Sequence, residues 1–334
     1  MATLTSNIFA EVRYYRKMSQ HFQAHLAKEP GDWIKFQEVF NLAVDKIYRD
    51  IQVFEKENIT RLESKVYKLK RIFEKRYRRY FLFGEFIKWS FDKPFGYSGD
   101  FKIIDEIYRN CPRTNGFDRL WDNYFQALAV CKAVRERKDD FKKIILDGIK
   151  GRNGKDIRIM DLACGPAREI KELIDEDKGG YFSRAIFDCY DLDLNALEYA
   201  KKLLSEAGNV NFSQKNAIRI ALKKDVTEEI ANKYDLIYST GLFDYLDERV
   251  AVRLVGNLRK LLKNDGILAV ANVRDKYSNS SAGWMEWVAE WNLIYRSEAQ
   301  FRKIFLDAGF PAQHLQIIAQ GSKVMQYCVA KNSL

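Results

Sequence analysis

The chain has 334 residues, 47% of them hydrophobic, and a formal net charge of +10. This length corresponds to about two domains, and the hydrophobic content is sufficient for a buried core. The sequence has no long apolar run that predicts a membrane span, and its first residues do not resemble a secretory signal peptide. Five cysteines without a C-x-x-C pair favour reduced thiols and a cytoplasmic location, and three histidines give little support to a metal site.

Residues 1–150 have the pattern of a helical region and hold most of the positive charge. They contain 30 Lys and Arg against 21 Asp and Glu, whereas the remaining residues contain 26 and 25. Within residues 62–81, apolar residues recur every three or four positions, which predicts one buried stripe along a helix. The opposite side of this predicted helix is basic and comprises Lys65, Lys68, Arg71, Lys75, Arg76 and Arg79.

A break in the helical pattern, DKPFGYSGDFK, occupies residues 92–102. We predict that residues 96–101 form a lid or wall of a ligand site, because Tyr97 offers a ring and a hydroxyl and Asp100 offers a carboxylate. An ordinary turn between two helices is the alternative interpretation.

From Asp156 onward, short apolar runs alternate with amphipathic helical segments, which is typical of a parallel sheet covered by helices. The predicted strands occupy residues 157–160, 185–190, 210–212, 235–239 and 266–273. Two further runs flank Gly321 and Ser322 and predict an antiparallel hairpin. The expected fold class is therefore α/β, with an open, mostly parallel sheet that ends in an antiparallel hairpin.

The loop after the first predicted strand, residues 161–167, is rich in small residues. In an open parallel sheet, ligands bind beyond the carboxyl ends of the strands. The loop has neither of the glycine patterns that cradle phosphates, and Glu169 follows where a phosphate would lie, so a pyrophosphate ligand is disfavoured.

A zwitterionic nucleoside without phosphate, such as S-adenosylmethionine, fits this loop better. Asp161 ends the first strand and is expected to receive the ammonium group. Asp191 ends the second strand and is expected to bind both ribose hydroxyls. The alternative for Asp161 is an ordinary carboxylate in the approach to the next helix. The alternative for Asp191 is a residue that caps the start of a helix.

The segment MDLACGPAREI resembles motif I of the class I S-adenosylmethionine-dependent methyltransferases. YDLIYSTGLFDYL and LLKNDGILAVANV match further landmarks of that family, over about residues 156–330. A narrower resemblance, in KPFGYSGDFKIIDEIY, GLFDYLDERVAVRL and EWNLIYRS, is to the methyltransferases of extracellular factor 3-hydroxypalmitic acid methyl ester biosynthesis. It implies a Rossmann-like methyltransferase domain over 151–334, a helical substrate or lid domain over 1–150, and carboxyl O-methylation of a hydroxy fatty acid.

The resemblance also implies a set of cofactor contacts and some departures from the family pattern. The implied cofactor-binding residues are Tyr97, Gly99, Asp100, Asp161, Ala163, Cys164, Gly165, Asp191, Leu192, Asn216, Ala217, Ser239, Thr240 and Gly241. Ala163 and Ala167 replace common glycines, so we expect a stiffer loop. Asn216 stands where many relatives place Asp against the adenine amino group, and the alternative is an Asn satisfied by backbone.

The sequence identifies the methyl acceptor less directly than the methyl donor. An ionised carboxylate needs no general base, and the sequence contains no convincing histidine base. We expect catalytic contributions from Tyr97, Arg135 and Tyr245, with Arg135 or Arg137 holding a substrate carboxylate in a bidentate pair. A solvated helix end is the alternative for both arginines.

Other functions remain open at this stage. The basic N-terminal half is consistent with RNA methylation, although no RNA-binding module and no N-P-P-[FY] motif is evident, so nucleic acid is the less favoured partner. N-methylation of a small amine is another alternative, and the basic helix over 62–81 is suited to an anionic membrane. Trp284, Trp287 and Trp291 recur at helical spacing, which predicts either a substrate pocket or packing of a helix on the sheet.

Overall fold

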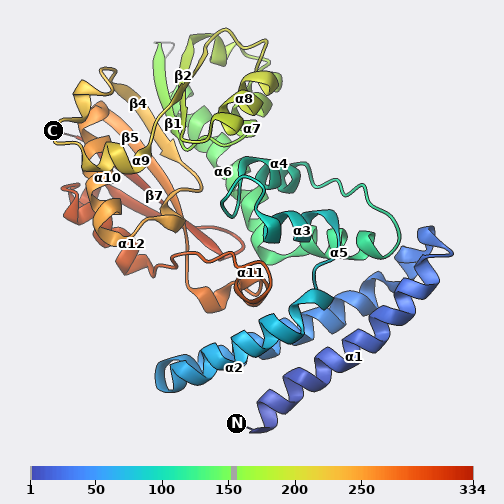
Figure 1. Ribbon diagram of the computed structural model, residues 1–334. Coiled ribbons are helices and arrows are strands. Elements are labelled where there is room, and N and C mark those ends of the chain that lie inside the picture. Colours follow the sequence, from blue (N-terminus) through green and yellow to red (C-terminus); the bar gives the residue numbers. More distant parts are fainter. Residues whose placement is uncertain (1, 152–155, 334) are drawn as a thin grey trace. The chain divides into compact units, whose positions relative to one another are not determined.

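The computed structural model describes residues 2–151 and 156–333, with side chains from residue 7 onward. The chain forms two compact units (Figure 1). The first unit runs to Lys132 and also includes Lys276–Asn292, and the second comprises Ala133–Asp275 and the residues from Leu293 onward. This division differs from the predicted boundary at residue 150.

The difference arises because most of helix α6, Ala129–Lys150, packs on the sheet of the second unit. The ring of Phe141 lies 5.9 Å from that of Tyr238 and 5.3 Å from that of Tyr327. The Tyr327 hydroxyl also donates to Asp140 at 2.8 Å. A single long helix therefore carries the chain from one compact unit into the other, and composition alone does not mark the change.

The first unit is helical, as the sequence predicts. Its longer helices are α1 Ala2–Leu26, α2 Trp33–Arg76, α3 Glu85–Asp92, α4 Phe101–Arg109, α5 Gly116–Ala127 and α11 Ala282–Trp287. Helices α1 and α2 lie side by side (Figure 1). The helix predicted over 62–81 forms the last part of α2, beginning at a non-helical Leu62 (φ −137°, ψ 38°) and ending at Arg76. Its apolar stripe is buried at Val66, Leu69 and Phe73, whereas its basic residues are exposed.

The tryptophans near residue 287 belong to the core of this first unit. The ring of Trp284 lies 5.4 Å from that of Phe125, and the ring of Trp287 lies 5.8 Å from that of Phe73. The indole N–H of Trp287 donates to Glu55 Oε2 at 2.9 Å. The prediction that this stripe packs on the sheet was wrong, because it packs on α2 and α5 instead. Periodicity predicts a buried face but does not identify what covers it.

The second unit contains a seven-stranded sheet within the described residues. The strands are β1 Ile157–Leu162, β2 Ala185–Asp191, β3 Val210–Gln214, β4 Tyr234–Ser239, β5 Leu262–Val273, β6 Leu315–Ala319 and β7 Met325–Asn332. Their order is β3-β2-β1-β4-β5-β7-β6, and β7 runs antiparallel to both of its neighbours, β5 and β6. This confirms the predicted fold class. The strand order reverses between β1 and β4, where open sheets of this kind bind ligands.

Helices cover the sheet on both faces (Figure 1). Besides α6 they are α7 Arg168–Asp175, α8 Leu194–Leu203, α9 Ala217–Leu222, α10 Glu248–Leu261 and α12 Glu298–Asp307. Apolar residues of α9, α10 and α12, such as Ile220, Leu254 and Phe301, share one core with strand residues of β1, β4 and β5. Helix α6 lies against the side chains of Tyr238 and Tyr327.

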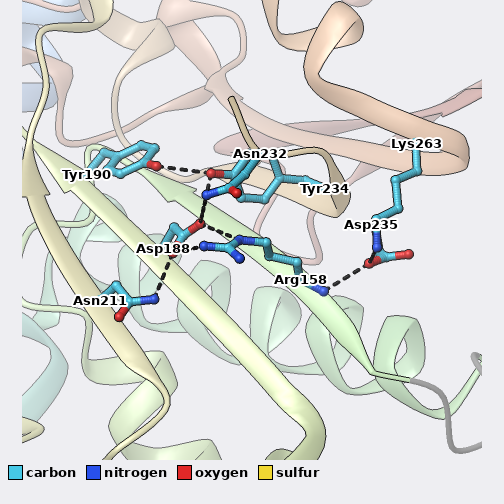
Figure 2. Close-up of polar contacts among 8 residues, drawn as sticks. All are labelled: Arg158, Asp188, Tyr190, Asn211, Asn232, Tyr234, Asp235 and Lys263. Carbon is cyan, nitrogen blue, oxygen red and sulfur yellow. Dashed lines mark hydrogen bonds and ion pairs between the residues drawn. The ribbon is translucent and has the colours of Figure 1, made fainter. Parts of the chain in front are cut away.

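A polar network holds the amino ends of the strands together (Figure 2). Buried Asp188 of β2 accepts two hydrogen bonds from the Arg158 guanidinium, at 2.7 and 3.1 Å. It also accepts from the Tyr234 hydroxyl at 2.9 Å and from Asn211 at 2.9 Å. One carboxylate thus ties β2 to β1, β3 and β4 at the edge opposite Asp161 and Asp191.

Candidate active site

The loop between β1 and α7 has a tightly wound backbone. Ala163, Gly165 and Ala167 all have positive φ, at 58°, 53° and 49°. Only glycine adopts such angles without steric cost. Two alanines, Ala163 and Ala167, are thus in left-handed conformations, and the stiffness of the loop stays a prediction. Strained backbone of this kind is concentrated at ligand sites in proteins.

Backbone hydrogen bonds place this loop against the end of β2. The register pairs Asp161 with Cys189 and Leu162 with Tyr190, so the two strands end side by side. The Cys164 N–H donates to the Tyr190 carbonyl at 3.1 Å. The Gly165 N–H donates to the carboxylate of Asp191 at 2.9 Å. The two carboxylates predicted to bind opposite ends of a nucleoside thus flank one small-residue loop.

Asp161 is a buried carboxyl group with an unused acceptor. It is 1% exposed, and its Oδ2 has no hydrogen-bond partner among the described residues. Burial, and then the neighbouring Glu169 carboxyl, raise the pKa of Asp161 well above its usual range. Glu169 lies beside Asp161, and its carboxylate accepts from the Tyr238 hydroxyl at 3.1 Å. An unpartnered, buried acceptor beside a second carboxyl suits a ligand ammonium group.

Asp191 has a different environment. Its Oδ2 accepts from the Gly165 N–H, and its Oδ1 accepts from the Asp193 N–H, both at 2.9 Å. Burial raises the pKa of this carboxyl. Asp193, not Asp191, caps α8 by accepting from the Asn195 N–H. Each oxygen of Asp191 keeps a lone pair, so the group retains capacity for ribose hydroxyls.

The segment after β4 completes this edge of the sheet. The Ser239 hydroxyl donates to the Leu162 carbonyl at 2.7 Å, so this side chain is committed to β1. Thr240 and Gly241 follow and are half-buried. A Cβ placed on Gly241 would lie 3.7 Å from both terminal nitrogens of Arg137. The guanidinium of α6 is therefore adjacent to the loop that faces the switch point.

Arg137 is 4% exposed and lies among acids. Burial raises the pKa of Asp244, and the positive charge of Arg137 acts in the opposite direction. Arg137 also counteracts the effect of burial on the pKa of Glu169. Arg135, by contrast, is half-buried, and Tyr245 is 43% exposed. Of the two predicted arginines, Arg137 is the one at the carboxyl ends of the strands.

The predicted adenine contacts lie after β2 and β3. Asn216 Oδ1 caps α9 by accepting from the N–H groups of Ile218 and Arg219, at 2.9 and 3.2 Å. Its side-chain NH₂ is thus the group with capacity for a base, and Ala217 begins the helix behind it. Leu192 and Ile218 are 56% and 49% exposed, which is unusual for apolar residues at neighbouring strand ends.

Tyr97, Gly99 and Asp100 belong to the first unit, so their assignment to the cofactor stays a prediction. Asp100 Oδ1 caps α4 through the N–H groups of Lys102 and Ile103, both at 2.9 Å. Its Oδ2 accepts from the indole N–H of Trp89 at 2.9 Å. Gly99 has a φ of 69° and Tyr97 is 40% exposed. The aspartate is therefore a structural residue of its own unit.

The sequence reasoning missed the role of Glu169 and Tyr238. In the sequence, Glu169 indicates only that a phosphate is disfavoured, whereas in the structure its carboxyl lies beside Asp161 and raises the pKa of that group. One signal was available, since Glu169 is an acidic residue in the first turn of a helix that must pack on the sheet. No sequence pattern predicts the role of Tyr238, because its hydroxyl reaches Glu169 only when β4 is paired with β1 in the folded sheet.

Comparisons with known proteins agree with this geometry. Residues 160–268 match the model of a family described as a methyltransferase domain. This match confirms that the chain carries a methyltransferase domain, and it confirms the predicted methyl donor, S-adenosylmethionine. The matched segment begins in β1 and ends in β5, and so includes Asp161, Asp191 and Gly241.

A curated relative and two solved structures are similar to larger or smaller parts of the chain. Malonyl-[acyl-carrier protein] O-methyltransferase of Halalkalibacterium halodurans is 30% identical over 135 residues, which cover 40% of this chain and 46% of that protein. The chain thus matches about half the length of this relative.

No helix in residues 2–151 and 156–333 combines the length and hydrophobicity needed to cross a membrane.

Among solved structures, a possible exported protein from Bordetella parapertussis has a TM-score of 0.56 at 19% identity, covering 70% of this chain and 80% of that one. Magnesium protoporphyrin IX methyltransferase from Synechocystis, solved with bound S-adenosylmethionine, has a TM-score of 0.43 at 15% identity, covering 61% and 84%. The first likeness supports the fold alone.

Proposed function

We propose that the whole chain is a small-molecule methyltransferase that transfers a methyl group from S-adenosylmethionine to a carboxylate oxygen of a hydroxy fatty acid or a related acid. The observation that carries the proposal is the buried guanidinium of Arg137 beside Gly241, at the carboxyl ends of the strands. A buried arginine is well suited to orient a carboxylate through paired hydrogen bonds.

The donor side of the proposed site rests on the residues of β1, β2 and their loops. Asp161 would accept the ammonium group at its unpartnered Oδ2, supported by Glu169. Asp191 would accept the ribose hydroxyls, and the exposed Leu192 and Ile218 would lie against the base. When bound, S-adenosylmethionine supplies an activated methyl group on a sulfonium, which a correctly aligned nucleophile displaces.

On the acceptor side, the chain has to position an already ionised group. A carboxylate carries its negative charge at neutral pH, so no residue has to remove a proton from it. Arg137 would hold the carboxylate and also keep water from competing for it. Tyr245, exposed after β4, would donate a hydrogen bond to the acceptor, and Tyr97 and Arg135 stay as predicted contributors.

The named substrate of the curated relative supports this class of acceptor. A malonyl group bound to a carrier through one end has a free carboxylate at the other. O-methylation of such a group therefore forms a methyl ester. The match covers 46% of that protein, so the identity of the acyl group rests on the narrower sequence resemblance.

The direct test uses donor labelled in the methyl group, purified protein and fractionated lipid, metabolite and RNA extracts. We expect label in an acidic lipid or metabolite fraction. Methyl esters are hydrolysed by mild alkali and release volatile methanol, whereas N-methyl groups are not. Alkali-stable label in amines, or label confined to RNA, would overturn the proposed acceptor.

A pair of variants tests the role of Arg137. Arg137→Gln should lower kcat/KM by at least about 100-fold, because a charge-assisted pair in a buried site contributes several kcal/mol. Arg137→Lys should recover part of this loss through a single ammonium contact. Binding of S-adenosylhomocysteine should stay within a few-fold of wild type in both. A parallel loss of product and cofactor binding would place Arg137 on the donor instead.

The basic face of α2 supports a peripheral membrane contact during delivery of a lipid-like acid. Five of the predicted basic residues lie in α2, and Arg79 follows its end at Arg76; all six are exposed, and Tyr67 between them is 56% exposed. Cosedimentation with anionic vesicles should depend on salt and should weaken in Lys68→Glu/Arg71→Glu. Equal binding to neutral vesicles, or a preference for RNA over vesicles, would contradict this contact.

A further inference from the structure

A groove in the second unit lies away from the carboxyl ends of the strands. Its volume is about 940 Å³, and it is lined by the end of α9, the last turns of α10, the start of β5 and Lys233 before β4. Asn332, near the end of the antiparallel β7, also lines it and pairs with Gly266 of β5. The groove is thus at the amino end of β4. The strand from Tyr234 to Ser239, roughly 17 Å long, separates it from the carboxyl end, where Gly241 follows.

The charged side chains that line the groove are all basic. Four exposed basic side chains line it, Lys224, Lys233, Arg253 and Lys260. Three half-buried ones join them, Lys223, Arg259 and Lys263. Among the described residues that line the groove, none is acidic.

Only part of this charge is neutralised within the chain. Lys263 pairs with buried Asp235 at 2.7 Å (Figure 2). Asp225, which lies near the groove, is held by the amide and hydroxyl of Thr227, and its pKa is also lowered by Lys260 and Lys233. Among the residues that the structure describes, Lys263 is thus the only one of the seven cations with an ion-pair partner.

The other hydrogen bonds of these cations are to neutral oxygens, and Arg259 also lies over the ring of Phe310. Lys233 donates to the Lys260 carbonyl, and Lys260 donates to Asn257 Oδ1 at 3.1 Å. Arg259 donates through Nε to Asn332 Oδ1 at 3.2 Å. An ammonium group has three donors and a guanidinium five, so each of these side chains keeps donors for a ligand. Such contacts orient the cations without removing their charge.

We propose that this groove binds an organic anion that carries two or more phosphate groups. Several uncompensated cations around one concavity match the charge density of a polyphosphate better than that of a single carboxylate. The volume lies in the range of small-molecule sites. Leu222, Leu262 and Ala308 add apolar surface for the organic part. The site is separate from the proposed methyl-transfer site.

The test is calorimetry with inorganic pyrophosphate and with uridine diphosphate, in the presence of saturating S-adenosylhomocysteine so that the cofactor site is filled. We expect saturable, one-to-one binding of both probes that weakens with salt, and much weaker binding of orthophosphate. Lys224→Glu/Arg253→Glu should weaken binding by at least about tenfold, since each reversal replaces attraction by repulsion. Neither side chain is part of the cofactor site, so binding of S-adenosylhomocysteine should be unchanged.

The matched control is Lys201→Glu/Lys202→Glu, which makes the same charge change on exposed residues of α8. It should leave binding of pyrophosphate within about twofold of wild type. Equal losses in the two double variants would show general attraction to a basic protein and overturn the site. Absence of saturable binding at low salt, or binding of duplex nucleic acid without binding of pyrophosphate, would do the same.

Discussion

The left-handed alanine at residue 163 leads to a quantitative prediction about the cofactor loop. An L-residue at positive φ brings Cβ close to a carbonyl oxygen, at a cost of roughly 1–2 kcal/mol that glycine avoids. Ala163 has a φ of 58° and is half-buried. Ala163→Gly removes this cost, but it also increases the unfolded-state entropy by about 0.4–1 kcal/mol and removes a partly buried methyl group.

Comparison with a control substitution removes the entropic and burial costs from the difference in stability, because both variants share them. Ala207 is also half-buried and outside the helices, but its φ is not positive. Ala207→Gly therefore has the entropic and burial costs without relief of strain. We expect Ala163→Gly to be more stable than Ala207→Gly by about 1–2 kcal/mol. For a unit of this size that difference corresponds to roughly 2–8 °C in Tm.

The assay is thermal and urea unfolding of the two variants, followed by circular dichroism, with S-adenosylhomocysteine binding as a second measurement. Ala163→Gly should bind the ligand within a few-fold of wild type, because glycine reaches the same loop conformation. Equal destabilisation by both variants would refute the reasoning, since it would mean that the alanine has no strain to release. Ala167→Gly should gain less than Ala163→Gly, because Ala167 is fully buried and loses its packed methyl group.

Three further outcomes follow from the contacts described above. Asp188→Ala should destabilise the second unit by about 3 kcal/mol or more, measured by urea unfolding, because it leaves the Arg158 guanidinium without its buried partner; a loss below about 1 kcal/mol would contradict the network. Trp287→Phe, which keeps an aromatic ring but removes the donor to Glu55 and part of the packed indole, should cost the first unit at least about 1–2 kcal/mol. No loss would mean that Lys276 alone satisfies Glu55. S-adenosylhomocysteine affinity should rise as pH rises through the elevated pKa of the Asp161 and Glu169 pair, because an ammonium group needs the ionised form, and calorimetry in two buffers should detect proton release. Asp161→Asn should remove most of that release, and an identical pH profile in this variant would contradict the assignment.

The carboxyl-edge assignment has its own direct check at Asp191. Asp191→Ala should weaken S-adenosylhomocysteine by about tenfold or more, since it removes the ribose acceptor and the partner of the Gly165 N–H. Asp191→Asn keeps the shape and one acceptor oxygen, and should lose less. Equal affinity in wild type and Asp191→Ala would show that the carboxylate does not bind the ligand.

Local pattern determined much of this protein. The alternation of short apolar runs and amphipathic helices specified the parallel sheet, since a strand buried on both faces needs a covering helix. The small-residue loop after β1 and the acids at two strand ends predict a donor site at one edge of the sheet, because parallel strands align their carboxyl ends. The period of residues 62–81 specified which face of α2 is buried.

Only the tertiary structure decided the contacts that join distant segments. Arg137 and Arg135 are equivalent in sequence, but the rotation of α6 on the sheet places only Arg137 beside Gly241. The seven basic residues of the groove come from separate segments, none of which is a basic run that predicts a site. Burial and long-range packing select partners that sequence spacing does not encode, and these partners determine the charge and pKa of each group.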